Sequence, residues 1–126
     1  MVIESSRVEW CMSWWRTLRG RDTAARHLDR LAVAAERRGH RGVKLYPDRS
    51  SAVPFPMLLF TVWGPKEDVG VLAMARAIPG GEWAYFDLFA EPWLPFAPCR
   101  DAVKAADQVA ALLHHRMYPG TFPAVS

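Results

Sequence analysis

The sequence predicts an α+β fold: a two-layer sandwich with a meander of three or four antiparallel strands, flanked by N- and C-terminal helices on one face (α-β-β-β-β-α). Near both ends of the chain, apolar residues recur at three- and four-residue steps, the spacing of a buried helix face. In the middle, short turns separate apolar runs of strand length. A parallel crossover needs about a dozen residues or more, so such short linkers favour antiparallel neighbours.

The first helix is predicted over residues 13–38. Its apolar face consists of residues at helical spacing: Trp14, Leu18, Ala25, Leu28, Leu31, Ala32 and Ala35. Gly20 weakens the middle of this segment, so a short turn followed by a main helix from about Asp22 is the alternative. Gly39 suits the left-handed backbone that ends a helix. Residues 1–12 lack a clear period and are expected as a lead-in whose order the pattern leaves open.

Four strands and a second helix are expected after the first helix. The strand segments are GVKLY (42–46), PMLLFTVW (56–63), DVGVLAMARAI (68–78) and EWAYFDLF (82–89). Pro92, Pro95 and Pro98 then predict an extended connection, because proline fits neither a helix interior nor a paired central strand. The last helix is predicted over residues 99–117, and residues 119–126 are predicted as a tail. A single domain therefore spans residues 13–118.

The predicted strands are apolar on both faces. In the strand 82–89, Trp83 and Tyr85 point to one face while Ala84 and Phe86 point to the other. An antiparallel sheet with one wet face should instead alternate apolar and polar residues. Two helices cover only one face of such a sheet. The other face must be covered by the N-terminal segment, by the proline-rich connection or by a second chain.

Composition predicts a folded domain and argues against several function classes. The chain has 126 residues, of which 51% are hydrophobic and 23% are charged. Its net charge of +3 comes largely from arginine, a bias that GC-rich codon usage explains, so the charge alone does not indicate nucleic acid. Two cysteines, no signal peptide and no apolar run of about 20 residues predict a cytoplasmic protein with reduced thiols and no membrane span.

The sequence offers no constellation of catalytic or metal-binding residues. Cys99 and His114 lie more than four turns apart on the last predicted helix, roughly 22 Å, and so cannot touch within it. His114 and His115 are adjacent and project about 100° apart, unlike the i, i+4 pair of a zinc helix. No glycine-rich phosphate loop is present. We therefore expect no catalytic residues, no metal and no cofactor.

A basic stripe on the first predicted helix is a candidate nucleic-acid surface. Its members fall within about 40° of one another by the helical angle: Arg19, Arg26, Arg30 and Arg37. Such a stripe can dock on a phosphate backbone. Asp22, Asp29 and Glu36 border it, which is typical of a salt-bridged, solvated helix face. Nucleic-acid binding is therefore only a third hypothesis.

The leading hypothesis, an interaction domain, rests on a cluster of aromatic residues. The candidate interaction surface consists of Trp63, Trp83, Tyr85, Phe89 and Trp93. Tryptophan and tyrosine are enriched at binding hot spots, and large exposed apolar patches mark partner sites. We expect a non-enzymatic interaction domain that acts as a homodimer or with a protein partner. The alternative is a small enzyme or ligand-binding domain, with a pocket under the aromatic strand and Arg76 and Asp87 as its polar contacts.

Three segments also carry a resemblance. PMLLFTVWGP, GGEWAYF and RDAVKAADQVAALL, following a helix that ends near glycine, resemble a loose group of small uncharacterised proteins of high-GC actinobacteria. The resemblance spans roughly residues 14–117. Genes of this group often lie beside helix-turn-helix regulators, so the resemblance implies a regulatory or accessory role. It transfers no catalytic residue to this chain.

Overall fold

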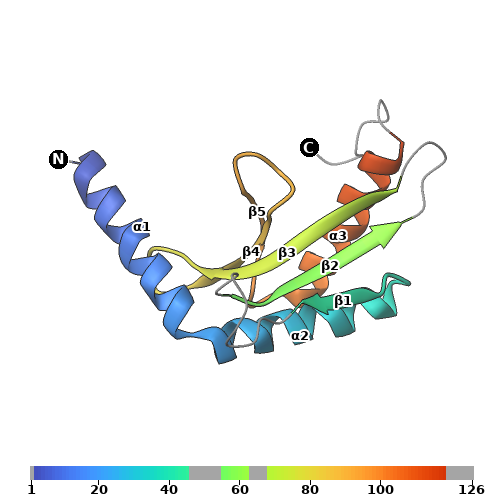
Figure 1. Cartoon of the computed structure of the whole chain (residues 1–126), viewed down its shortest axis with the longest axis horizontal. Helices are drawn as coiled ribbons and strands as arrows, with labels where there is room; N and C mark the ends of the chain where they lie inside the picture. Colours follow the sequence, from blue (N-terminus) through green and yellow to red (C-terminus); the bar gives the residue numbers. More distant parts are fainter. Residues whose placement is uncertain (1, 46–54, 63–67, 119–126) are drawn as a thin grey trace.

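The computed structural model describes residues 2–45, 55–62 and 68–118 of the chain. These residues contain three helices and five strands. In chain order they are α1 (Val2–Arg19), α2 (Arg21–Arg37), β1 (Gly42–Leu45), β2 (Met57–Val62), β3 (Val69–Ala77), β4 (Trp83–Asp87), β5 (Leu94–Pro98) and α3 (Ala102–Met117). Figure 1 shows this arrangement. The predicted α+β class is confirmed.

The five strands form one antiparallel meander in the order β1-β2-β3-β4-β5. Leu59 pairs with Leu72, and Ala75 pairs with Tyr85, so each short turn joins neighbouring strands as predicted. The fifth strand lies where the prolines predicted only an extended connection. Pro95 and Pro98 are tolerated there because β5 is an edge strand, which pairs with a neighbour along one side only.

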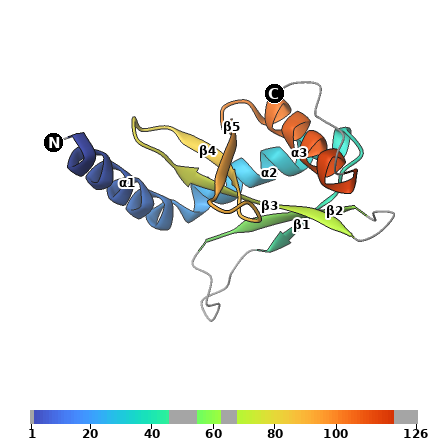
Figure 2. The ribbon, with the colours of Figure 1, turned by 90° about the horizontal axis from the view of Figure 1, so that it is seen from above.

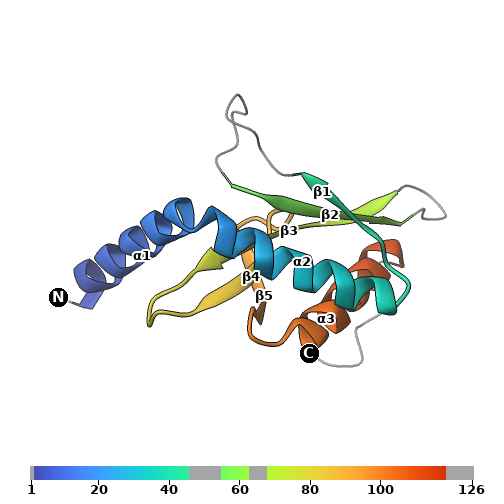
Figure 3. The same ribbon diagram turned by 90° about the horizontal axis from the view of Figure 1, so that it is seen from below.

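Helices α2 and α3 pack against each other and cover one face of the sheet (Figures 2 and 3). The main core lies between these two layers and centres on fully buried leucine, phenylalanine and tyrosine side chains: Leu28, Leu31, Leu58, Phe60, Tyr85 and Leu113. Gly39, at φ +89°, ends α2 as predicted. Asp101 caps α3, where its Oδ1 accepts a hydrogen bond of 3.0 Å from the Lys104 backbone N–H.

Helix α1 is separate from α2. The long helix predicted over residues 13–38 breaks at Gly20, and the lead-in from Val2 onward is helical. A Cβ at Gly20 would come within 3.0 Å of the Trp83 ring, so the side-chain-free residue lets the indole pack against the junction. From there α1 runs away from the sheet, and its N-terminal end projects beyond the rest of the fold (Figure 1).

The second face of the sheet carries its own smaller core. Phe55, Met74, Ala84 and Phe86 are buried there, and Trp14 of α1 packs against them. The N-terminal segment therefore covers part of this face, one of the possibilities that the sequence left open. Trp93, between β4 and β5, adds to the cover, since its ring lies 6.2 Å from Trp14 and 6.4 Å from Phe55.

Candidate functional site

The inner side of α1 is fixed to the end of the β3–β4 hairpin. The Thr17 hydroxyl donates to the Ser13 carbonyl and accepts a hydrogen bond of 2.9 Å from the Ala77 backbone N–H. The side chain of Thr17 is fully buried. The preceding residue, Arg16, donates from its Nη2 to the Glu82 carbonyl at 3.0 Å. These polar contacts set the position of α1 on the sheet, because a buried N–H group needs a partner.

Arg76 completes the inner contact. Its guanidinium carbon lies 5.1 Å from the Trp10 ring centroid, 5.0 Å from Trp14 and 5.6 Å from Phe86. These distances are in the range of cation–π attraction. Burial lowers the pKa of Arg76 from its ordinary value. Arg76 thus links α1 to the second face of the sheet, because its guanidinium group lies against aromatic rings from both.

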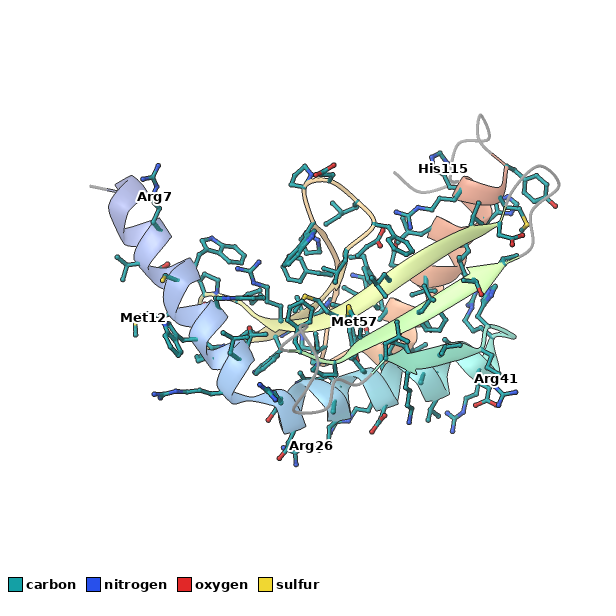
Figure 4. All side chains as sticks on the ribbon, in the orientation of Figure 1. Arg7, Met12, Arg26, Arg41, Met57 and His115 are labelled. Atoms are coloured by element: carbon teal, nitrogen blue, oxygen red, sulfur yellow. The ribbon has the colours of Figure 1, made fainter. Side chains whose placement is uncertain are left out.

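The outer side of α1 is also apolar. Val8 is 56% exposed, Met12 64% and Trp15 60%. At 100° per residue these three fall within about 60° of one another, on the side opposite Trp14 and Thr17. Figure 4 shows the Met12 side chain directed away from the sheet. We call Val8, Met12 and Trp15 the outer stripe.

A hollow lies beside the outer stripe. Met12, Trp15, Arg16 and Arg19 line it, and its volume is about 370 Å³. Apolar side chains thus meet two cationic ones at the C-terminal end of α1. A helix that is apolar on two opposite sides is normally covered on both, and the described part of the chain covers only the inner side.

The predicted aromatic surface is divided between the core and the exterior. Tyr85 is fully buried between sheet and helices, and its hydroxyl donates to the His27 carbonyl at 2.5 Å. Trp83 is half-buried against His27 on α2, with ring centroids 5.6 Å apart. Both were expected on an interaction surface. For Tyr85 this prediction is wrong, because its side chain has no exposed area, whereas Trp83 stays partly accessible. Phe89 and Trp93 are exposed, whereas Trp63 lies outside the described residues.

Arg76 and Asp87 do not share a pocket. Arg76 faces α1 on the second sheet face, whereas Asp87 faces the helix layer and is fully buried. Asp87 forms an ion pair with Arg116 of α3, and its Oδ1 accepts a hydrogen bond of 3.1 Å from the Phe89 backbone N–H. Arg116 also donates to the Gly70 carbonyl at 2.6 Å. The expected pairing of the two residues around a ligand is therefore wrong, because they point to opposite faces.

The arginine stripe also differs from its prediction. Arg26, Arg30 and Arg37 are exposed on α2, but Arg19 belongs to α1 and lines the hollow beside the outer stripe. The break at Gly20 removes Arg19 from the common helical face. The predicted stripe therefore loses Arg19, while Arg26, Arg30 and Arg37 remain together on one exposed face of α2. Nucleic-acid binding through these three residues stays a prediction.

A second hollow of about 220 Å³ lies where α2 meets the β4–β5 side of the sheet. Its lining residues come from distant parts of the chain: His27, Arg30, Glu82, Trp83, Cys99 and Arg100. Arg100 Nη1 lies 3.6 Å from Glu82 Oε1. Within the described residues, the buried His27 Nδ1 has no hydrogen-bond partner. This site was not predicted from the sequence, because no local motif joins residues so far apart.

Electrostatics in this hollow disfavour nucleophilic chemistry. Burial raises the pKa of the Cys99 thiol to about 12, so the thiol stays protonated at neutral pH. A thiolate is the nucleophilic form of cysteine. Burial also raises the pKa of Tyr85 above its usual range. The hollow is therefore better suited to binding than to covalent catalysis.

The pKa of His27 predicts a pH dependence of stability. Burial, and then the positive charges of Arg30 and Arg26, lower the pKa of His27 from its ordinary value. As the pH falls through about 6.5, the unfolded chain therefore binds a proton that the folded chain resists. We expect the free energy of unfolding to decrease between about pH 7 and pH 5, and less steeply in His27→Gln. Urea unfolding across this range is the measurement, and identical pH profiles would contradict the assignment.

Comparisons with models of protein families, with curated proteins and with solved structures find no match to this chain. The resemblance to the actinobacterial group therefore stays a prediction. Among the described residues, no three histidine, cysteine, aspartate or glutamate side chains are grouped to hold a metal ion. In the same part of the chain, no helix has the length and apolar character to cross a membrane.

Proposed function

We propose that this chain is a non-enzymatic interaction domain that associates with a second copy of itself through α1. The observation that carries the proposal is the outer stripe, whose members are 56%, 64% and 60% exposed on a helix whose other side is already packed. Contiguous exposed apolar side chains mark partner surfaces. The interaction function is the one expected from the sequence, but its surface moves from the sheet face to α1.

The charges of α1 favour a second copy in antiparallel orientation. Glu9 lies toward the N-terminal end of the outer stripe, whereas Arg16 and Arg19 lie toward its C-terminal end. A two-fold axis near Met12 brings Glu9 of one copy close to Arg16 of the other. The same arrangement packs the two outer stripes together. Opposite charges thus flank an apolar centre, as at many protein interfaces.

The hollow beside the outer stripe suits this arrangement. It measures about 370 Å³ and has Met12 and Trp15 in its wall. In an antiparallel pair, Val8 of the second copy lies opposite this region, and its side chain fills part of the hollow. Tryptophan and arginine in such a position are typical of interface residues that carry binding energy.

Charge substitutions in the outer stripe test the proposal. We expect Trp15→Glu to raise the dimer dissociation constant about 30-fold or more, because a hot-spot aromatic residue contributes about 2 kcal/mol or more. Val33→Glu is the matched control, since Val33 is a 53% exposed residue on α2. Sedimentation velocity gives both constants. Equal dissociation constants for the two variants would exclude α1 as the interface.

Cys11 provides a test of pairing through α1. It is exposed on α1, whereas Cys99 is buried and its thiol stays protonated, so a thiol-reactive spin label attaches selectively to Cys11. Packed helices lie about 8–10 Å apart. We expect electron-spin distance measurements to give a short label-to-label distance in the dimer. Well-separated labels in a confirmed dimer would refute the antiparallel α1 pairing.

A further inference from the structure

We propose that the hollow beside Trp83 binds a small organic monoanion that carries a flat ring, such as an aromatic carboxylate. The hollow takes its walls from α2, from the β4 strand and from the segment between β5 and α3, and it is lined by residues that include His27, Arg30, Trp83 and Arg100. This binding function is independent of self-association through α1.

The charge of the hollow sets the charge of its ligand. Arg30 and Arg100 are cationic, and Glu82 lies within 3.6 Å of Arg100. Within the described part of the chain, no carboxylate lies in ion-pair distance of Arg30. The walls therefore carry one net positive charge, centred on a guanidinium whose geometry suits two carboxylate oxygens. A monoanion neutralises this charge, whereas a dianion exceeds it.

The volume of the hollow and the residues that line it indicate that the ligand contains a ring. An apolar cavity of about 150 Å³ holds benzene, so the 220 Å³ of this hollow accommodates one six-membered ring with a carboxylate. The Trp83 indole and the protonated Cys99 thiol supply apolar wall atoms against which such a ring can lie. Pockets of this kind combine apolar walls with a few placed polar groups.

A residue that lines the hollow also carries an unsatisfied polar atom. Among the described residues, the buried Nδ1 of His27 has no hydrogen-bond partner, and His27 lines the hollow. Native proteins leave few buried polar atoms unpaired, and each one calls for an explanation. His27 therefore brings an unused hydrogen-bonding group to one wall of the hollow, and Arg30 beside it supplies the accessible donors for an anion.

Titration with benzoate tests the proposal. We expect a saturable shift of the Trp83 indole N–H resonance, assigned by its loss in Trp83→Phe, with a dissociation constant on the order of 1 mM. Neutral benzamide is expected to leave the resonance in place. Inorganic phosphate is expected to shift it more weakly, because phosphate has no ring to lie against the indole.

Arg30→Gln identifies the charged partner. We expect this substitution to weaken benzoate binding about tenfold, since it removes a charge-assisted hydrogen bond. Arg37→Gln is the matched control, because Arg37 is an exposed arginine of the same helix that does not line the hollow. The proposal is overturned if benzoate causes no shift, if benzamide or phosphate binds equally well, or if Arg30→Gln binds benzoate with wild-type affinity.

Discussion

Asp87→Ala is expected to lower the free energy of unfolding by about 3 kcal/mol, because removal of one partner of a buried ion pair leaves the other charge uncompensated. Asp87 is fully buried, and Arg116, its partner, has only 25% of its side chain exposed. The pair joins the C-terminal turn of α3 to β4, and Arg116 also holds the Gly70 carbonyl of β3. Urea unfolding followed by circular dichroism measures the effect.

Asp107→Ala is the matched control for this prediction. Asp107 also forms an ion pair from α3, with Arg38, but the two side chains are 49% and 48% exposed. Exposed pairs contribute about 1 kcal/mol or less, so this variant should remain close to wild type. A loss of similar size in both variants would contradict the structural role assigned to Asp87.

Trp14→Ala is expected to lower the free energy of unfolding by about 2–3 kcal/mol. Its ring packs against Phe55, 5.6 Å between centroids, and against the Arg76 guanidinium at 5.0 Å. Removal of the ring uncovers part of the small core on the second sheet face. The estimate lies below that for a fully buried tryptophan because Trp14 is half-buried.

The neighbouring tryptophan is the control. Trp15 is 60% exposed on the opposite side of α1, so Trp15→Ala should change monomer stability by about 0.5 kcal/mol or less. Both variants are compared at submicromolar concentration, where mass action favours the monomer. At higher concentration Trp15→Ala should lose the stabilisation that association adds. Equal monomer stabilities for the two variants would refute the division of α1 into an inner and an outer side.

Most of the fold follows from local sequence signals. The apolar runs of strand length in β2, β3 and β4 and the short turns between them predicted the antiparallel meander, and the spacing of Leu28 and Leu31 predicted α2. The strand β5 was missed because prolines normally interrupt strands, and only its position at the sheet edge makes them acceptable. The position of a strand at the edge depends on the order of strands in the whole sheet, and a local sequence pattern does not give that order.

Helix α1 shows why its N-terminal half had no visible period. Trp10 and Trp14 belong to the inner side, whereas Val8, Met12 and Trp15 belong to the outer stripe. Two apolar stripes on opposite sides of one helix cancel the amphipathic signal. Taken separately, each stripe has helical spacing, and this spacing could have predicted that α1 begins before residue 13.

The candidate sites were less predictable than the fold. Strand alternation, together with the β3–β4 register that pairs Arg76 with Ala84, places Arg76 and Asp87 on opposite faces. Their separation was therefore accessible once that register was known. The burial of Tyr85 was not, because both faces of β4 are apolar and nothing local says which face the helices cover. The hollow that gathers His27, Trp83 and Cys99 depends on the packing of α2 against the sheet.

Sedimentation velocity of the wild-type chain across the micromolar range tests self-association most directly. We expect a concentration-dependent shift from a species of 14.2 kDa to one of twice that mass. Trp15→Glu should stay at the lower mass over the same range. A wild-type chain that sediments only as the 14.2 kDa species at every concentration would contradict α1 as a self-association surface.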